Sequence, residues 1–142
     1  RDHFNLTSSH IIPAIVKKIT DAKKSSSTEI EVWGTGTPTR EFLYVLDAAE
    51  GIVSAVEKYD KPEPVNLGSG QEMTIKYVVE RIVKLMDFKG KITWVSDKPD
   101  GQPRRCLDTT RAETEFGFKA QTPFDVGLAN TIKWYQEQSI DI

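Results

Sequence analysis

The chain has 142 residues, of which 38% are hydrophobic and 28% are charged, and its formal net charge is −2. This length and composition suit a single soluble domain with a substantial core. The lack of net basic charge argues against a broad nucleic-acid or membrane-surface footprint. No apolar run approaches the roughly 20 residues of a transmembrane helix. Cys106 is the only cysteine, which excludes an intrachain disulfide and favours a reducing, cytoplasmic setting.

Hydrophobic spacing predicts a first helix that ends near Ala22. Ser8 or Ser9 is expected to cap it, and Pro13 fits its first turn, where a missing N–H is harmless. The residues on its apolar face are Ile11, Ile12, Ile15, Val16 and Ile19. Residues 29–33 alternate in polarity and include β-branched side chains, so they are predicted to form a strand.

The middle of the chain carries weaker signals. Residues 42–45 and 64–67 are each predicted to form a short strand, the second ending at a Gly-Ser-Gly turn (68–70). Between them, Asp47 is expected to lead a helix. The residues sharing its apolar face are Ala49, Ile52, Val53 and Val56.

The second half contains the clearest helix, which Thr74 is expected to cap. Its apolar positions are Ile75, Val78, Val79, Ile82, Val83 and Met86. A strand is predicted over 91–95, a short helix over 110–116, and a last helix that begins at Thr122 and Pro123. The last helix is expected to turn Phe124, Leu128, Thr131, Ile132 and Tyr135 inward. Few, short strands between helices indicate a small mixed α/β lobe rather than a full doubly wound sheet.

The stretch from Trp33 to Val45 carries the strongest chemical signal. An apolar strand runs into a Gly/Thr/Pro turn, and Gly34 and Gly36 let the backbone approach a ligand closely. Trp33 places a flat ring and Arg40 a fixed positive charge at the rim. A ring and an anion together describe a nucleotide.

Several motifs that would complete an enzyme are not found in the sequence. The Gly-x-Gly pairs at 34–36 and 68–70 lack the third glycine of a dinucleotide-binding turn. No tyrosine has a lysine four residues later, and the chain has no Gly-x-Ser-x-Gly motif, P-loop or metal-spaced His/Glu pair. By its motifs, this chain is not expected to turn over a substrate unaided.

Four segments occur in an order that is typical of one enzyme family. They are Ser-His-Ile-Ile-Pro (9–13), Trp-Gly-Thr-Gly-Thr-Pro-Thr-Arg-Glu-Phe-Leu-Tyr-Val (33–45), Asn-Leu-Gly-Ser-Gly (66–70) and Lys-Pro-Asp-Gly-Gln-Pro-Arg-Arg (98–105). Together they resemble the C-terminal half of the GDP-L-fucose synthase family, which are extended short-chain dehydrogenase/reductases of the NAD-dependent epimerase/dehydratase group. The second and fourth segments are fairly specific to this family, whereas the third is shared by many nucleotide-sugar epimerases and dehydratases.

The resemblance implies that residues 1–142 form a substrate-binding domain without the Rossmann domain. Residues 1–24 would then hold a helix that packs against that missing domain. The family epimerises GDP-4-keto-6-deoxy-mannose at C3 and C5 and reduces it at C4 with NADPH. NADP(H) would be bound mainly by the missing N-terminal domain, so the chain alone is expected to hold no cofactor and to be inactive. The implied partners are the GDP-sugar, the missing domain and a homo-oligomer, with no nucleic acid and no membrane.

The family's catalytic histidine corresponds to His10, which would protonate the sugar carbon and also lie against the cofactor. Imidazole suits this role because it titrates near neutrality. Without the resemblance, a histidine at a helix start is more often a surface or capping residue. Cys106 does not correspond to the family's cysteine base, which lies in the missing half, and it is interpreted as a buried structural thiol.

The implied substrate-binding residues come from three places. Trp33 would line the pocket, and Arg40 would contact the diphosphate or sugar because guanidinium offers a fixed fork for anions. Lys18 stands where the family has a basic residue. The 98–105 loop would contribute Asp100, as an acceptor for guanine N–H groups, together with Lys98 and Arg104 at phosphates or sugar hydroxyls.

Plainer interpretations stay open for these positions. Trp33 is alternatively a core residue, Lys18 a solvated helix lysine, and Arg40 the partner of Glu41 or Asp47 in a salt bridge. The loop is alternatively an ordinary charged connector. For the whole chain, the alternatives are the substrate lobe of another nucleotide-sugar epimerase or dehydratase, or a stand-alone non-catalytic interaction domain.

Overall fold

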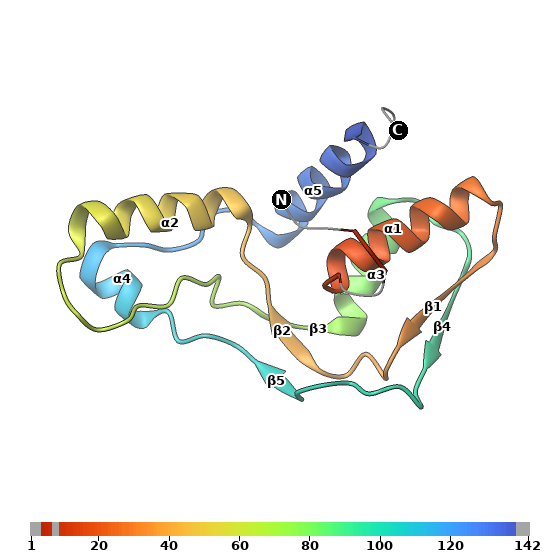
Figure 1. Ribbon diagram of the computed structural model, residues 1–142, viewed down its shortest axis with the longest axis horizontal. Helices are drawn as coiled ribbons and strands as arrows, with labels where there is room; N and C mark the ends of the chain where they lie inside the picture. Colours follow the sequence, from red (N-terminus) through yellow and green to blue (C-terminus); the bar gives the residue numbers. More distant parts are fainter. Residues whose placement is uncertain (1–3, 7–8, 139–142) are drawn as a thin grey trace. The chain divides into compact units, whose positions relative to one another are not determined.

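The computed structural model describes residues 4–6 and 9–138. They form two compact units (Figure 1): the first comprises the residues up to Pro38, Thr74–Pro103 and those from Ile132 on, and the second comprises Thr39–Met73 and Arg104–Thr131. The elements in chain order are α1 (Ile11–Lys24), β1 (Glu29–Trp33), β2 (Thr39–Glu41), α2 (Val45–Lys58), β3 (Glu72–Thr74), α3 (Ile75–Leu85), β4 (Lys91–Val95), β5 (Arg104–Arg105), α4 (Thr110–Phe116) and α5 (Phe124–Gln138). The mixed α/β lobe expected from the sequence is confirmed.

The first unit is built on the parallel pair β1–β4, whose register runs from Glu29 opposite Lys91 to Trp33 opposite Val95. Helix α1 packs on α3 and on β1. The core consists of the predicted apolar positions of these elements, all nearly or fully buried: Ile15, Val16, Ile19, Ile30, Val32, Val78, Val79 and Ile82. Both strands predicted in this unit, 29–33 and 91–95, have the predicted bounds.

The two helices of the first unit begin differently. Thr74 caps α3 as predicted, because its Oγ1 accepts a hydrogen bond from the Tyr77 N–H (3.1 Å). The predicted cap of α1 by Ser9 is wrong: His10 is the N-cap, and no side chain caps this end. Pro13 is the third residue of α1 and lacks the N–H that a capping side chain would bind there. The other predicted cap, Ser8, lies outside the described residues.

The second unit holds a three-stranded sheet in the order β3–β2–β5, with β2 and β5 parallel. Helix α2 packs on α4. The small core is aromatic, with Ala112, Phe116 and Phe118 buried. The partly buried residues packed against it are Leu43, Ala55, Tyr59, Val65 and Leu67.

Two predicted strands of the second unit are wrong. The strand next to the Gly/Thr/Pro turn is 39–41, and residues 42–44 form no regular element before α2 begins. Residues 64–67 also form none, because Val65 and Leu67 pack against the aromatic core while no neighbouring strand among the described residues pairs with them. The short strand β3 was not predicted.

Helix α2 has its apolar stripe outside. Ile52, Val53 and Val56 are exposed, Val56 to 82%. The face turned inward contains Asp47 and Gly51, and the absence of a Cβ at Gly51 leaves room for the Phe118 ring. This helix therefore keeps an unpartnered apolar face within the described chain.

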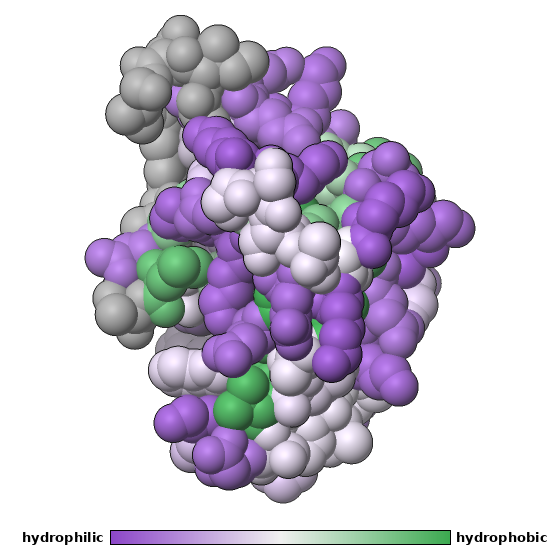
Figure 2. Space-filling model, turned by 90° about the vertical axis from the view of Figure 1, so that its right-hand side faces the viewer, coloured by the Kyte–Doolittle hydropathy of each residue, from purple (hydrophilic) through white to green (hydrophobic). Residues whose placement is uncertain are grey.

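Among its described residues, the surface of the first unit has no comparably large apolar area on the side that Figure 2 shows. Figure 2 shows the side formed by this unit as mainly hydrophilic, with hydrophobic side chains in small separate areas. Across residues 4–6 and 9–138, no helix combines the length and apolar character needed to cross a bilayer.

Candidate functional site

Trp33 lies at the end of β1 with its side chain outside the core. Alternation buries Ile30 and Val32 and leaves Trp33 64% exposed, so the core alternative for Trp33 is wrong. The Nζ of Lys98 lies 5.8 Å from the centre of the indole ring, within the range of a cation–π interaction. The structure thus brings two of the predicted substrate-binding residues together.

Asp100 fastens its loop to the turn that follows β1. Its Oδ1 accepts a hydrogen bond from the Thr35 N–H (2.6 Å), and its Oδ2 accepts one from the Thr35 hydroxyl (2.7 Å). These bonds, with a weaker contribution from the Gly36 N–H, hold the pKa of Asp100 below its ordinary value. Gly34 has φ +86°, and a Cβ there would collide with the Asp100 carboxylate. The predicted guanine contact of Asp100 would use oxygen lone pairs that these bonds leave.

The rest of this turn is held by α3. The Gly36 and Pro38 carbonyls accept hydrogen bonds from the Lys76 and Ile75 N–H groups, both at 2.9 Å. These donors belong to the first turn of the helix, where N–H groups have no partner inside the helix. The turn after β1 is therefore fixed on two sides, by α3 and by Asp100, with the Trp33 ring at its rim.

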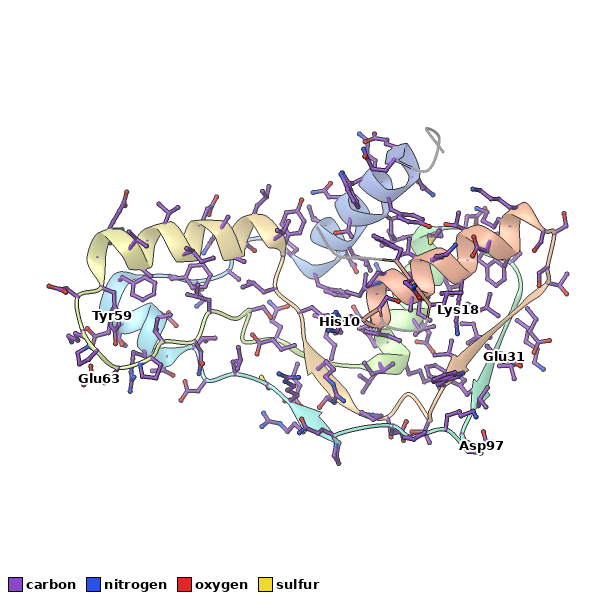
Figure 3. The ribbon with its side chains drawn as sticks, viewed as in Figure 1. His10, Lys18, Glu31, Tyr59, Glu63 and Asp97 are labelled. Atoms are coloured by element: carbon purple, nitrogen blue, oxygen red, sulfur yellow. The ribbon has the colours of Figure 1, made fainter. Side chains whose placement is uncertain are left out.

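His10 and Lys18 both lie on α1 but are well separated along it (Figure 3). His10 is exposed at the N-cap, where its carbonyl accepts from the Ala14 N–H (3.0 Å). Lys18 donates from Nζ to the Glu31 carbonyl (2.8 Å). Eight residues of helix put the two about 12 Å apart along the axis. Lys18 is thus not simply a solvated lysine: its ammonium is held at β1.

On one face of the β2–β5 pair, the carboxylate of Glu72 is paired with Arg104. Thr39 pairs in register with Arg104, and both contact Glu72: the Thr39 hydroxyl donates to it, and Arg104 donates from Nε and Nη2 (2.9 and 2.8 Å). The hydrogen bond from Thr39 lowers the pKa of Glu72 most, and the one from Arg104 lowers it further. This guanidinium is already paired with Glu72. The contact with phosphates or sugar hydroxyls that was predicted for Arg104 stays a prediction.

The opposite face of the same pair carries two arginines. Arg40 and Arg105 are in register, and paired residues of neighbouring strands lie on the same face of a sheet. Arg40 donates from Nη1 to the Thr39 carbonyl (2.7 Å), and Arg105 is exposed. Like charges side by side destabilise a sheet, whereas guanidinium pairs suit a bound anion. Arg105 was not among the predicted site residues, because only the register of β5 with β2 places it beside Arg40.

Glu41 organises the segments around this ladder. Its Oε1 accepts from the N–H groups of Ser69 (2.5 Å) and Gly70 (3.2 Å), and its Oε2 accepts from the Leu107 N–H (2.8 Å) and the Cys106 thiol (3.2 Å). Partial burial raises the pKa of Glu41, but these hydrogen bonds outweigh it and hold the pKa below its ordinary value. The only role predicted for Glu41 from the sequence was the alternative of a salt bridge with Arg40.

Cys106 is only half-buried, so the part of its interpretation that made it a buried thiol is wrong. The hydrogen bond to Glu41, and then burial, raise the pKa of this thiol. In the described part of the chain, no three His, Cys, Asp or Glu side chains gather as a metal site. The two Gly-x-Gly turns there lead into β2 and β3 rather than into helices.

Comparisons with known proteins bear on this site. Residues 1–68 match the model of the NAD dependent epimerase/dehydratase family. The probable GDP-L-fucose synthase 1 of Oryza sativa is 42% identical over 140 residues, which cover 99% of this chain and 42% of the relative. The GDP-L-fucose synthase of Escherichia coli is 34% identical over 145 residues, covering 96% of this chain and 45% of the relative. The crystal structure of a GDP-L-fucose synthetase from Naegleria fowleri bound to NADP superposes with a TM-score of 0.90 at 28% identity, over 97% of this chain and 43% of that one.

The resemblance to the NAD-dependent epimerases/dehydratases is thereby confirmed. The chain is similar to the GDP-L-fucose synthases over nearly its whole length. It spans less than half the length of these relatives.

Proposed function

We propose that this chain is the GDP-sugar-binding portion of a GDP-L-fucose synthase, which epimerises and reduces GDP-4-keto-6-deoxy-mannose. The observation that carries the proposal is the pair Arg40 and Arg105, two guanidiniums on one face of the β2–β5 ladder. Such a pair suits a diphosphate, because each guanidinium can donate two parallel hydrogen bonds to phosphate oxygens. The likeness to GDP-L-fucose synthases over 99% of the chain supports the same substrate class.

Four residues of the first unit, Lys18, Trp33, Lys98 and Asp100, are proposed from the resemblance as contacts of the GDP-sugar. The exposed Trp33 ring offers a stacking surface, and Lys98 lies close to that ring. Asp100 fixes the turn beside it and is proposed to accept from guanine N–H groups with its free lone pairs. Lys18 is proposed to assist through its positive charge, which the Glu31 carbonyl holds in place.

His10 is proposed to move a proton during epimerisation. A base in the part of the enzyme outside this chain would take a proton from the carbon next to the keto group and leave an enolate, and the protonated His10 ring would give a proton to that carbon and become neutral. Exposure at the start of α1 leaves the ring accessible. A histidine fits because its ordinary pKa lies near neutrality.

NADPH would supply the hydride for reduction of the keto group. We assign its binding mainly to the part of the enzyme outside this chain, because both Gly-x-Gly turns described here lead into strands and lack the helix N-terminus that receives a pyrophosphate. We further propose that His10 contacts this cofactor and that the chain alone is inactive.

We also propose that the part of the enzyme outside this chain packs on the apolar face of α2. The relatives are more than twice as long as this chain, and Ile52, Val53 and Val56 are exposed. Helix α1, proposed from the sequence to pack against the missing domain, already buries Ile15, Val16 and Ile19 within the first unit. In light scattering the isolated chain is expected to self-associate through the α2 face, and V53D/V56D to make it monomeric. Unchanged association would contradict this assignment.

A panel of nucleotides tests the proposed function. The melting temperature of the chain is measured with GDP, UDP and dTDP at equal concentrations, since a ligand that binds the folded state raises it. GDP is expected to give the largest rise, and R40Q is expected to reduce it. A larger rise with UDP or dTDP would indicate another nucleotide-sugar enzyme. No rise with any nucleotide would favour a non-catalytic interaction domain.

A further inference from the structure

We propose that Glu41 is a positioning residue, whose carboxylate fixes the register of β2 and β5 and so keeps Arg40 and Arg105 on one face. The inference rests on the proposed function, because that function gives the arginine pair its ligand, the diphosphate of the substrate. Glu41 itself lies on the opposite face of β2 from Arg40, since neighbouring residues of a strand point to opposite faces. It acts on the ligand only through the two arginines.

The contacts of Glu41 reach two other segments of the second unit. From β2, its Oε1 binds the Ser69 and Gly70 N–H groups, and its Oε2 binds the N–H of Leu107 and the thiol of Cys106. Leu107 and Cys106 directly follow β5. One side chain therefore joins the 68–70 turn and the end of β5 to the strand that carries Arg40.

The ladder needs this support because it is short. Only two residue pairs, Thr39–Arg104 and Arg40–Arg105, define the register of β2 and β5. A shift of one residue would turn every side chain of one strand to the other face. Arg105 would then lie on the face of Glu72, and Arg104 on the face of Arg40. The Glu41–Leu107 bond lies just beyond the last pair and opposes that shift.

The chemistry of the contacts calls for a carboxylate. All four groups that face Glu41 are donors, three N–H groups and one S–H. An ionised carboxylate only accepts, with two oxygens and about four lone pairs. Glutamine has the same shape but would direct its NH₂ group at one pair of these donors. The substitution E41Q therefore removes the contacts on one oxygen without changing the size of the side chain.

A double-mutant cycle in the enzyme that carries this sequence tests the inference. R105Q is expected to weaken GDP binding about tenfold in calorimetry, the effect of a lost charge-assisted hydrogen bond. E41Q is expected to weaken it by a similar factor, and the double variant to be no weaker than E41Q alone. Independent effects would multiply instead, and a product of the two factors would overturn the proposal.

Asp47 offers the matched control. Its buried carboxylate also accepts from a backbone N–H and a hydroxyl, both of Thr122 (3.0 and 2.9 Å), and within the described chain these bonds lie away from the β2–β5 ladder. D47N is expected to lower stability and to leave the tenfold effect of R105Q intact. If D47N removes that effect as E41Q does, general loosening explains both and positioning by Glu41 is wrong.

A second readout needs no ligand and separates this inference from the proposed function. In wild-type protein, nuclear Overhauser contacts are expected between the backbones at 40 and 105, and in E41Q they are expected to weaken together with protection of the Leu107 amide from hydrogen exchange. Cys106 is expected to be alkylated faster in E41Q. Unchanged contacts in E41Q would overturn the inference even if GDP binds. Their loss in a protein that binds no GDP would support Glu41 and contradict the proposed function.

Discussion

The ammonium of Lys98 lies 5.8 Å from the centre of the Trp33 ring, so the loop after β4 meets the end of β1 at an exposed aromatic side chain. The Asp100–Thr35 bonds fasten the same loop to the turn that follows Trp33. The ring is therefore held at a fixed rim rather than on a free loop.

Removal of the ring is expected to weaken nucleotide binding. Stacking of a base on an aromatic side chain is worth about 1–3 kcal/mol, so W33A should raise the Kd for GDP roughly five- to a hundredfold in calorimetry. W134F, at another partly exposed tryptophan, serves as the control and should leave the Kd unchanged. Equal affinity of W33A and wild type would show that Trp33 lies outside the nucleotide site.

Asp47 is expected to matter for stability rather than for binding. It is the one buried charged residue found in the described chain, and it satisfies two donors of Thr122 just before α5. D47A would leave these donors unpaired and should cost about 1–3 kcal/mol in urea unfolding. E50A, at an exposed position of the same helix, should stay within about 0.5 kcal/mol of wild type. Similar losses in both variants would contradict the role of Asp47.

Two glycines with positive φ allow a comparison of strain with and without a clash. Gly36 and Gly117 have φ of +76° and +73°. A Cβ at Gly36 would meet the Trp94 ring at 2.6 Å, whereas a Cβ at Gly117 has nothing within 4 Å. G117A should cost about 1–2 kcal/mol, and G36A clearly more, in urea unfolding. A smaller loss for G36A would mean that the turn beside Trp33 is not packed as described.

Acid is expected to destabilise the chain through Glu41, Glu72 and Asp100. The pKa of each is lowered in the folded chain, so between the folded and unfolded pKa the unfolded state binds more protons. Stability then rises with pH in that range. Their contribution is present above the ordinary pKa of about 4–4.5 and is lost as pH falls below it. Melting temperatures from pH 6 to pH 3 should fall less steeply for E41Q; an identical slope would contradict the shift of Glu41.

Local signals in the sequence predicted most of the first unit, except for the cap of α1. Alternation predicted the bounds of β1, the bounds predicted for β4 were also right, and the Thr74 cap is a contact between residues three apart. Trp33 also came from a local motif, whereas Lys98 and Asp100 came from the resemblance to a known family. The structure added the contact of Trp33 with Lys98 and that of Asp100 with Thr35.

The second unit depends on contacts that the sequence does not reveal. Residues 64–67 have a strand-like pattern but pack on the aromatic core without a pairing strand. Arg104 and Arg105 are adjacent in sequence. Only the register with β2 shows that Arg104 lies on the face of Glu72 and Arg105 on the face of Arg40. The partners of Glu41 lie 28 to 66 residues further along the chain, and no local sequence pattern indicates these contacts.

The most direct test of the proposed function compares the binding of GDP and guanosine by calorimetry, in wild type and in R40Q/R105Q. The two ligands differ by the diphosphate, which is proposed to lie on the arginine pair. Wild type is expected to bind GDP at least about tenfold more tightly than guanosine, the effect of charge-assisted hydrogen bonds, and the double variant is expected to bind the two alike. Equal binding of GDP and guanosine by wild type, or a preference for GDP that survives in R40Q/R105Q, would contradict the proposal.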